Sequence, residues 1–239
     1  DPSVVDPGSV VAEEPPAPAC VMSFNASDAS GAGGSAGDVA TISAMGAHTL
    51  PVITSIVLRD SAEVFDQHPI EAEHVAEQAR TILEDVTLAA WKVGFLGNAD
   101  NVAAVAEILS DYPDVPLVAY MPSLGWVDED ELQNYMEAFR ELILPAAEVL
   151  VGNHKTLTDF LLPDWDNERA PSAREMQQAL RFVDVFRRDD APADAALRWR
   201  SNTPLAELRQ LATRFLGAEA AERAFAGYAR RGSPDAALL

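Results

Sequence analysis

Apolar and polar positions show two different periodicities between residues 20 and 160. Short runs of apolar, often β-branched residues predict strands, whereas stretches with an apolar residue every three or four positions predict helices. Strands are expected at 21–24, 52–58, 89–95, 115–120 and 149–151. Helices are expected at about 38–45, 71–85, 99–110 and 128–144. The alternation predicts βαβ units, and therefore a three-layer α/β fold in which a mostly parallel sheet lies between helices.

Two of these segments carry more specific signals. The run from Val52 to Leu58 is apolar on both faces, which is typical of a buried strand in a parallel sheet. Asp128, followed three residues later by Glu131, predicts the start of a helix, and Pro145 predicts its end. Ligands of such folds bind beyond the carboxyl ends of the strands, so functional residues are expected there.

Composition divides the 239 residues into three parts. Residues 1–19 contain five prolines and little periodicity, which predicts a flexible leader. Residues 20–175 hold the alternating pattern and are expected to form the α/β domain. Residues 1–175 carry a net charge of −23, whereas 176–239 carry +2 and are rich in arginine and alanine. This shift predicts a divergent helical segment from 176 to 239.

The C-terminal segment has a helical pattern from Thr203 to Arg231, with an apolar stripe on one face and arginines on the other. One interpretation is that one or two helices pack on the α/β domain. A second is a segment that binds a partner or forms an oligomer. A third is a separate origin of the segment, through a fusion or a frameshift.

Charge and potential ligands exclude several kinds of partner. With 17 basic and 38 acidic residues the net charge is −21, which disfavours binding to nucleic acid and to anionic membrane surfaces. The longest nearly unbroken apolar run, about 50–58, is far shorter than the ~20 residues of a membrane-spanning helix. A single cysteine, Cys20, and four histidines without metal-ligand spacing give no zinc site. No signal-peptide pattern is seen, so a cytoplasmic protein is expected.

Candidate chemistry begins at the glycine-rich turn after the first predicted strand. Small residues from Asn25 to Gly34 allow a ligand to approach the backbone, and the next helix offers free N–H groups to an anion. Asp38, at the expected start of that helix, either caps it or accepts a hydrogen bond from the ring amine of a ligand. The same turn also serves as a simple tight connection between strand and helix.

Two cationic residues lie on predicted strands. Arg59 ends the second strand, where it either contacts a ligand or forms a surface ion pair with Asp60. Lys92 is flanked by apolar residues in the third strand, and the simplest interpretation is an edge residue whose amine extends outward to solvent.

Five short motifs agree in order and spacing with one family of enzymes. They are Phe24–Asp38, Ser43–Ala47, Pro51–Thr54, Lys92–Gly97 and Val151–Asn153. Through them residues 20–175 resemble the hydroxymethylpyrimidine/phosphomethylpyrimidine kinases of thiamine biosynthesis. The resemblance implies a ribokinase-like fold and transfer of a phosphoryl group from ATP to the pyrimidine hydroxymethyl group, then to its monophosphate. It also implies Mg²⁺, a small pyrimidine substrate and a homodimer.

The resemblance also implies which residues contact the pyrimidine. Ala26 corresponds to a backbone contact, and Asp38 to the carboxylate that holds the amino group and a nitrogen of the ring. Arg59 stands where a glutamine usually binds the ring, and Phe95 where a methionine usually packs on it. Such a mixture of one carboxylate, donors and an apolar wall suits a flat heteroaromatic ring.

Departures from the family pattern concern the nucleotide side, for which Lys92 and Asn153 are the candidate residues. The family's Asp-Pro-Val-Met stretch appears as Met121–Leu124 and its Asn-x-x-Glu as Asn153–Thr156, both without the carboxylate that helps to place Mg²⁺. The late glycine-rich turn that supplies the anion hole and the catalytic base is not recognisable. The fold is therefore expected to be incomplete in its C-terminal half, and no catalytic residue or metal ligand is assigned.

Three functions remain open. The first is the pyrimidine kinase, and the alternative is a catalytically inactive relative that binds a pyrimidine or a partner protein in a regulatory role. The third is an oxidoreductase with a nucleotide cofactor, since Gly31-x-Gly33-x-x-Ala36 fits a loose dinucleotide fingerprint. In that fingerprint an acidic residue is expected ~20 residues on, whereas Asp60 lies 27 residues past Gly33.

Overall fold

The computed structural model describes residues 17–31, 33–166, 169–172, 174–176 and 178–179. Nearly all of the predicted leader and of the predicted C-terminal segment, including its pattern at 203–231, lies outside the described residues. The elements are β1 (Cys20–Asp28), α1 (Gly34–Ala44), β2 (His48–Arg59), β3 (Val64–Pro69), α2 (Ala72–Leu83), β4 (Ala90–Val93), α3 (Ala99–Ser110), β5 (Leu117–Tyr120), α4 (Glu129–Ala138), η1 (Phe139–Ile143), η2 (Leu144–Ala146), β6 (Val149–Val151) and α5 (His154–Leu161).

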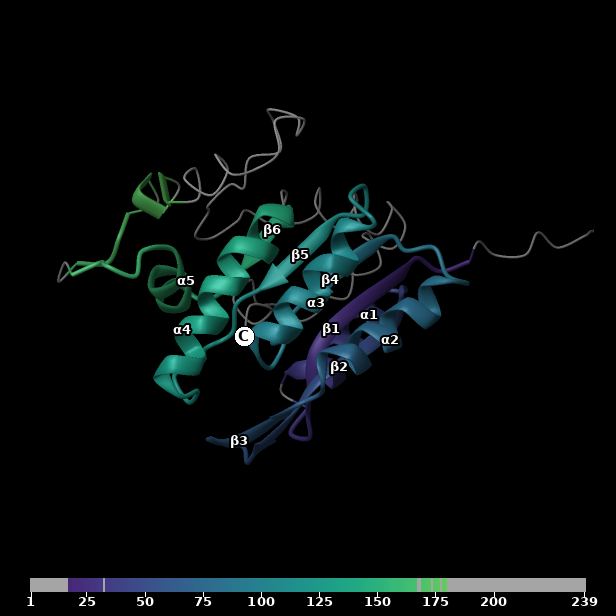
Figure 1. Ribbon diagram of the computed structural model, residues 1–239, viewed down its shortest axis with the longest axis horizontal. Coiled ribbons are helices and arrows are strands. Elements are labelled where there is room, and N and C mark those ends of the chain that lie inside the picture. The colour runs from purple at the N-terminus through teal and green to yellow at the C-terminus, as the bar shows by residue number, and fades with distance from the viewer. Residues whose placement is uncertain (1–16, 32, 167–168, 173, 177, 180–239) are drawn as a thin grey trace, which may run out of the picture.

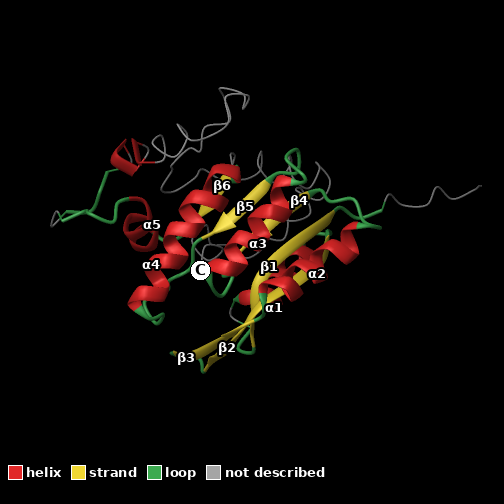
Figure 2. Ribbon diagram, in the orientation of Figure 1, coloured by secondary structure: helices red, strands yellow, loops and turns green. Residues whose placement is uncertain are grey.

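One sheet of six strands forms the centre, in the order β3-β2-β1-β4-β5-β6 (Figure 1). Neighbouring strands are parallel except for β2 and β3, which are antiparallel. Helices run along the strands (Figure 2), so the predicted α/β fold with a mostly parallel sheet is confirmed. None of the helices in the described ranges combines the length and the apolar character needed to cross a membrane.

The direction in which the chain crosses the sheet reverses at β1. From β1 the chain passes through α1 to β2, and it later returns through α2 to β4 on the other side of β1. Because crossovers between parallel strands are right-handed, α1 lies on one face of the sheet and α2 on the other, where it packs against α3. The carboxyl ends of β1 and β4 therefore form a topological switch point, the usual place for a ligand in an open α/β sheet.

Most predicted elements are present, with changes at their ends. Helix α3 and strand β6 occupy the predicted residues. Helix α1 begins at Gly34 rather than near Asp38, because the positive φ of Gly34 (63°) lets the chain turn directly from β1 into the helix. The helix predicted at 128–144 is capped by Asp128 as expected but ends at Ala138, after which a π turn and a 3-10 turn lead to β6.

The hairpin of β2 and β3 differs most from the prediction. Strand β3 is absent from the sequence-based pattern and forms by antiparallel pairing with the second half of β2. The expectation that Val52–Leu58 is buried throughout is wrong: Val52 is buried, but Ile56 and Leu58 are 44% and 43% exposed. This part of β2 belongs to a hairpin that extends past the helices (Figure 2).

Asn101, in the first turn of α3, is a fully buried polar residue that joins three segments. Its Nδ2 donates to the carbonyl oxygens of Leu96, Ile70 and Thr54 at 2.8, 3.0 and 3.1 Å. These carbonyls belong to the loop after β4, the residue after β3 and the middle of β2. Since buried carbonyls need donors, this one side chain fixes the hairpin and the β4 loop against α3.

Asn101→Ala is expected to lower the free energy of unfolding by about 2–4 kcal/mol, because the carbonyls of Leu96 and Ile70 lose this donor and that of Thr54 keeps only the N–H of Ile70. Asn134→Ala, at an exposed position of α4, is the matched control and should change it by less than about 0.5 kcal/mol. Urea unfolding monitored by circular dichroism measures both values. Equal effects of the two substitutions would contradict the joining role of Asn101.

Candidate functional site

A partly buried carboxylate lies at the switch point between β1 and β4. Asp38 Oδ2 accepts hydrogen bonds from Ser23 Oγ at 2.6 Å, from Asn25 Nδ2 at 2.9 Å and from Lys92 Nζ at 2.7 Å. Ser23 and Asn25 lie on β1, Asp38 on α1 and Lys92 on β4, and we call these four residues the Asp38 cluster. Ser23 is directly opposite Lys92 in the register of the two strands, which brings both donors to the same oxygen.

The position of Asp38 in α1 explains why it faces the sheet. The N-cap of α1 is Gly33, so Asp38 lies about one turn inside the helix, and the interpretation of Asp38 as a helix cap is wrong. Its side chain is only 17% exposed and points to β1 and β4 instead. All three hydrogen bonds end on Oδ2, and within the described residues Oδ1 has no donor. One oxygen of a held carboxylate is therefore left for a ligand.

Lys92 does not extend outward from an edge strand as the sequence suggested. Strand β4 lies inside the sheet between β1 and β5, and the Lys92 amine turns inward to Asp38, 5.7 Å from the centre of the Tyr120 ring. Burial lowers the pKa of Lys92 below its usual value of 10.5, and the Asp38 carboxylate opposes this shift without cancelling it. The pair is thus a partly desolvated ion pair.

Arg59 forms its ion pair with a residue other than the neighbour that the sequence suggested. Its Nη1 lies 3.5 Å from Oδ2 of Asp28, a carboxylate buried at the end of β1. Asp60 contributes only its backbone oxygen to Arg59, while its carboxylate accepts hydrogen bonds from the amides of Ala62 and Glu63. The structure therefore places Arg59 beside the glycine-rich turn.

Ala26 and Phe95 occupy the two strand ends that border the Asp38 cluster. Ala26 is buried in β1, and Phe95 follows β4 with its side chain 6% exposed. The Phe95 ring packs against Trp126 and Tyr135, with ring centres 5.4 and 5.5 Å apart. The Phe95 ring thus belongs to an aromatic group, while the Phe95 backbone N–H reaches the cluster and donates to Asn25 at 3.1 Å.

Asn153 lies apart from the Asp38 cluster, after the edge strand β6. It caps α5 by accepting a hydrogen bond from the amide of Thr156 at 2.9 Å. Thr156 also contacts the carbonyl of Met121, so the two segments that depart from the family pattern lie side by side after β5 and β6. Of the two nucleotide-side candidates, the structure therefore brings only Lys92 to Asp38.

The described residues do not fit a magnesium site. Among them no three His, Cys, Asp or Glu side chains gather as ligands of a metal ion. Ser123 and the residues at 154–156 bring no carboxylate to the segments after β5 and β6. Because Mg²⁺ prefers carboxylate and phosphate oxygens, no step is assigned here to a bound metal.

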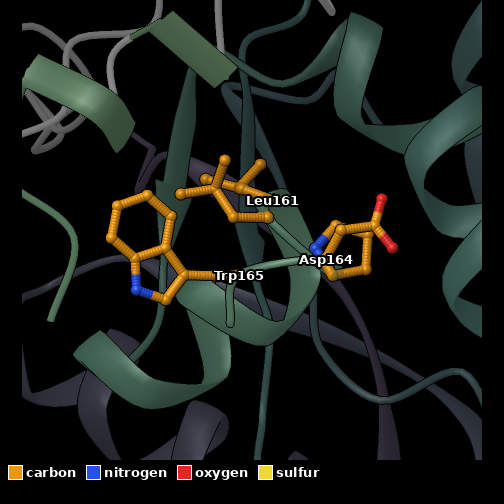
Figure 3. Close-up of a pocket in the computed structure, with 5 residues that line it drawn as sticks. Leu161, Asp164 and Trp165 are labelled. Carbon is orange, nitrogen blue, oxygen red and sulfur yellow. The ribbon is translucent and has the colours of Figure 1, made fainter. Parts of the chain in front are cut away.

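A hollow of about 250 Å³ lies elsewhere, lined by residues 161–165 (Figure 3). Its tryptophan, Trp165, stacks under Arg169 and donates a hydrogen bond to the Arg169 carbonyl. The hollow lies at the C-terminal end of α5, whose last residue, Leu161, lines it, whereas Asn153 caps the N-terminal end of that helix. None of the residues predicted to bind a ligand lines it.

Sequence reasoning missed three residues that the structure brings to the site, Ser23, Asn25 and Asp28. Each is a polar residue of β1 that is 8% exposed or less. The available signal was that an otherwise apolar strand leads into a glycine-rich turn while carrying polar side chains. Their partners on α1, β2 and β4 are distant in sequence, so their role appears only in the folded chain.

Comparisons with known proteins show what the chain is similar to. A family model described as phosphomethylpyrimidine kinase matches residues 28–184. The hydroxymethylpyrimidine/phosphomethylpyrimidine kinase of Haemophilus influenzae is 30% identical over 168 residues, which cover 68% of this chain and 62% of that protein. The enzyme of the same description from Escherichia coli K12 is 36% identical over 160 residues, covering 66% and 58%. The chain thus spans about three fifths of the length of these two curated relatives.

A solved structure shows the same fold. The phosphomethylpyrimidine kinase of Clostridium difficile 630 superposes with a TM-score of 0.58 at 20% identity, over 69% of this chain and 71% of that one. The predicted ribokinase-like fold is therefore confirmed.

The ion pair of the Asp38 cluster yields a prediction about Lys92. Asp38→Asn should lower the pKa of Lys92 further, because burial then acts without the opposing carboxylate. The sequence has only one other lysine, Lys155, whose side chain is 84% exposed and pairs with Asp159. Methylating both amines with ¹³C and titrating their NMR signals measures both pKa values, with Lys155 as the internal reference.

The same shift has a consequence for stability. The folded protein releases the Lys92 proton at a lower pH than the unfolded chain does, so its free energy of unfolding should rise with pH between the lowered pKa and 10.5. In Asp38→Asn this interval should widen toward lower pH. An unchanged or raised pKa of Lys92 in the variant would contradict the ion pair.

Proposed function

We propose, from the premise that the chain belongs to the phosphomethylpyrimidine kinase family, that it binds a hydroxymethylpyrimidine or its monophosphate as the acceptor of a phosphoryl group from ATP. The observation that carries the proposal is the Asp38 carboxylate at the switch point. It is held through one oxygen by Ser23, Asn25 and Lys92, and its other oxygen has no donor among the described residues. This family placement favours the kinase over an oxidoreductase with a dinucleotide.

The chemistry of an aminopyrimidine suits this arrangement. An exocyclic amine donates hydrogen bonds, and Asp38 Oδ1 is an acceptor held in place by the bonds to Oδ2. The aromatic wall that begins at Phe95 offers an apolar surface for the flat ring. Arg59, fixed near the turn by Asp28, offers donors to an oxygen or nitrogen of the substrate. In this proposal these side chains bind and orient the pyrimidine.

Fewer of the described residues are assigned to the binding of ATP than to the binding of the pyrimidine. Phosphoryl transfer depends on the placement of the reacting groups and on neutralising phosphate charge. The segments after β5 and β6 contribute Asn153 and several backbone groups but no carboxylate. The proposal therefore gives the described residues the pyrimidine side, and it includes ATP with Mg²⁺ and a cytoplasmic homodimer only as family properties.

The decisive experiment consists of two measurements. The first is ATP turnover in the presence of hydroxymethylpyrimidine, and the second is calorimetric binding of the same pyrimidine without ATP. The wild-type protein should phosphorylate hydroxymethylpyrimidine with ATP. Asp38→Ala should lower kcat/KM for this reaction by about 100-fold or more, because the amine of the ring loses its charged acceptor. Asp159→Ala is the matched control, since it removes the carboxylate of the exposed ion pair with Lys155 and should leave turnover within about twofold.

The other outcomes separate the competing functions. Pyrimidine binding that depends on Asp38, without turnover, would identify a relative that binds the pyrimidine but does not transfer phosphate. A well-folded protein with neither binding nor turnover would overturn the assignment of Asp38 and Arg59 and leave only the fold.

A further inference from the structure

We infer that Asn25 is a positioning residue that holds Asp38 and the backbone of Phe95 in a fixed relation to each other. Asn25 does not belong to the residues that the resemblance implied as pyrimidine contacts. The inference deepens the proposed function and rests on it, because Asp38 and Phe95 are the two sides between which the pyrimidine is proposed to bind.

The amide of Asn25 bonds to three separate groups. Its Nδ2 donates to Asp38 Oδ2 at 2.9 Å, while its Oδ1 accepts from the backbone N–H of Ala26 at 3.0 Å and of Phe95 at 3.1 Å. The side chain is 5% exposed. Two amide donors on Oδ1 fix which end of the side chain faces the carboxylate, because only the opposite end can donate to it. Asn25 therefore touches three of the four residues proposed to contact the pyrimidine.

Gly94 closes the space around this amide. A Cβ atom at position 94 would lie 2.5–2.7 Å from the three atoms of the Asn25 amide, which is too close for a side chain. The Gly94 N–H also donates to the carbonyl of Phe24 at 2.8 Å, which holds the loop after β4 against β1. Because the loop presses on the amide, Asn25 has little room to rotate. The link from α1 to the β4 loop is therefore stiff.

The other two donors of the cluster lack this second connection. Ser23 and Lys92 bond to Asp38 but have no hydrogen bond to the loop that carries Phe95 among the described residues. Loss of Ser23 should therefore loosen Asp38 alone, whereas loss of Asn25 should loosen Asp38 and leave the buried amides of Ala26 and Phe95 without an acceptor. This difference makes the inference testable.

The test compares pyrimidine binding by calorimetry in the full-length wild type and four variants. Asn25→Ala should weaken the binding of hydroxymethylpyrimidine by about tenfold or more, and clearly more than Ser23→Ala. Thr49→Val is the matched control, because the Thr49 hydroxyl is buried in the same sheet and has no hydrogen-bond partner among the described residues. This variant should bind the pyrimidine within about twofold of wild type. Thermal unfolding of each variant confirms that the compared samples are folded.

Asn25→Asp is the fourth variant, and it keeps the inference testable if Asn25→Ala does not fold. It keeps an acceptor for both amides but cannot donate to Asp38, and it places a second carboxylate beside the first. It should therefore also weaken pyrimidine binding by about tenfold or more, and it should raise the pKa of Lys92.

The outcomes separate this inference from the proposed function. If wild type does not bind the pyrimidine, the proposed function fails and the positioning role fails with it. If wild type binds and the Asn25 variants bind equally well, only the role of Asn25 is overturned. If Asn25→Ala weakens binding no more than Ser23→Ala, Asn25 is one donor among three, and its coupling to Phe95 is overturned.

Discussion

The arrangement at the centre of this protein depends on the pairing of one partly buried carboxylate, Asp38. A charge removed from water is costly unless it is paired and hydrogen-bonded, and Asp38 receives three donors at a single oxygen. These donors come from β1 and β4, whereas the carboxylate comes from α1. The pairing therefore holds helix and sheet together at one point. It also leaves the second oxygen of the carboxylate in a defined position, which is what a ligand-binding group requires.

Topology explains why this point is suited to a ligand. The chain crosses the sheet in opposite directions from β1, so helices on opposite faces separate around the carboxyl ends of β1 and β4. The short strand β4 ends at Val93, and Gly94 allows the following loop to lie directly on Asn25. The loop then delivers Phe95 to the aromatic cluster with Trp126 and Tyr135. Close backbone contact and a buried aromatic wall thus meet beside the same carboxylate.

The centre of the sheet and the side that ends at β6 differ in the groups that they present to a ligand. Around β1 the structure supplies a carboxylate, two cations and an aromatic wall, which are the groups that recognise a small heteroaromatic ring. After β5 and β6 it supplies a helix capped by Asn153, without carboxylates for a metal ion. This contrast is why the proposal assigns the pyrimidine side to named residues and assigns no catalytic residue. The family model matches residues 28–184, which include Asp38, Lys92 and Asn153.

The sequence by itself determined the α/β class, the helix at 99–110, the strand at 149–151 and the family, because local periodicity and short motifs survive without knowledge of distant contacts. It also singled out Asp38, as a helix cap or, through the resemblance, as a ligand of the pyrimidine ring. It singled out Lys92 as an outward-pointing edge residue or, through the resemblance, as a nucleotide-side candidate. Only the tertiary structure decided that these two residues pair, that Arg59 meets Asp28, and that Asn25 links α1 to the β4 loop. It likewise decided the pairing of β3 and the exposure of Ile56. The reason is physical: a buried polar group takes its partners from whichever strands and helices the fold brings within hydrogen-bond distance, and those partners here lie 13 to 70 residues away.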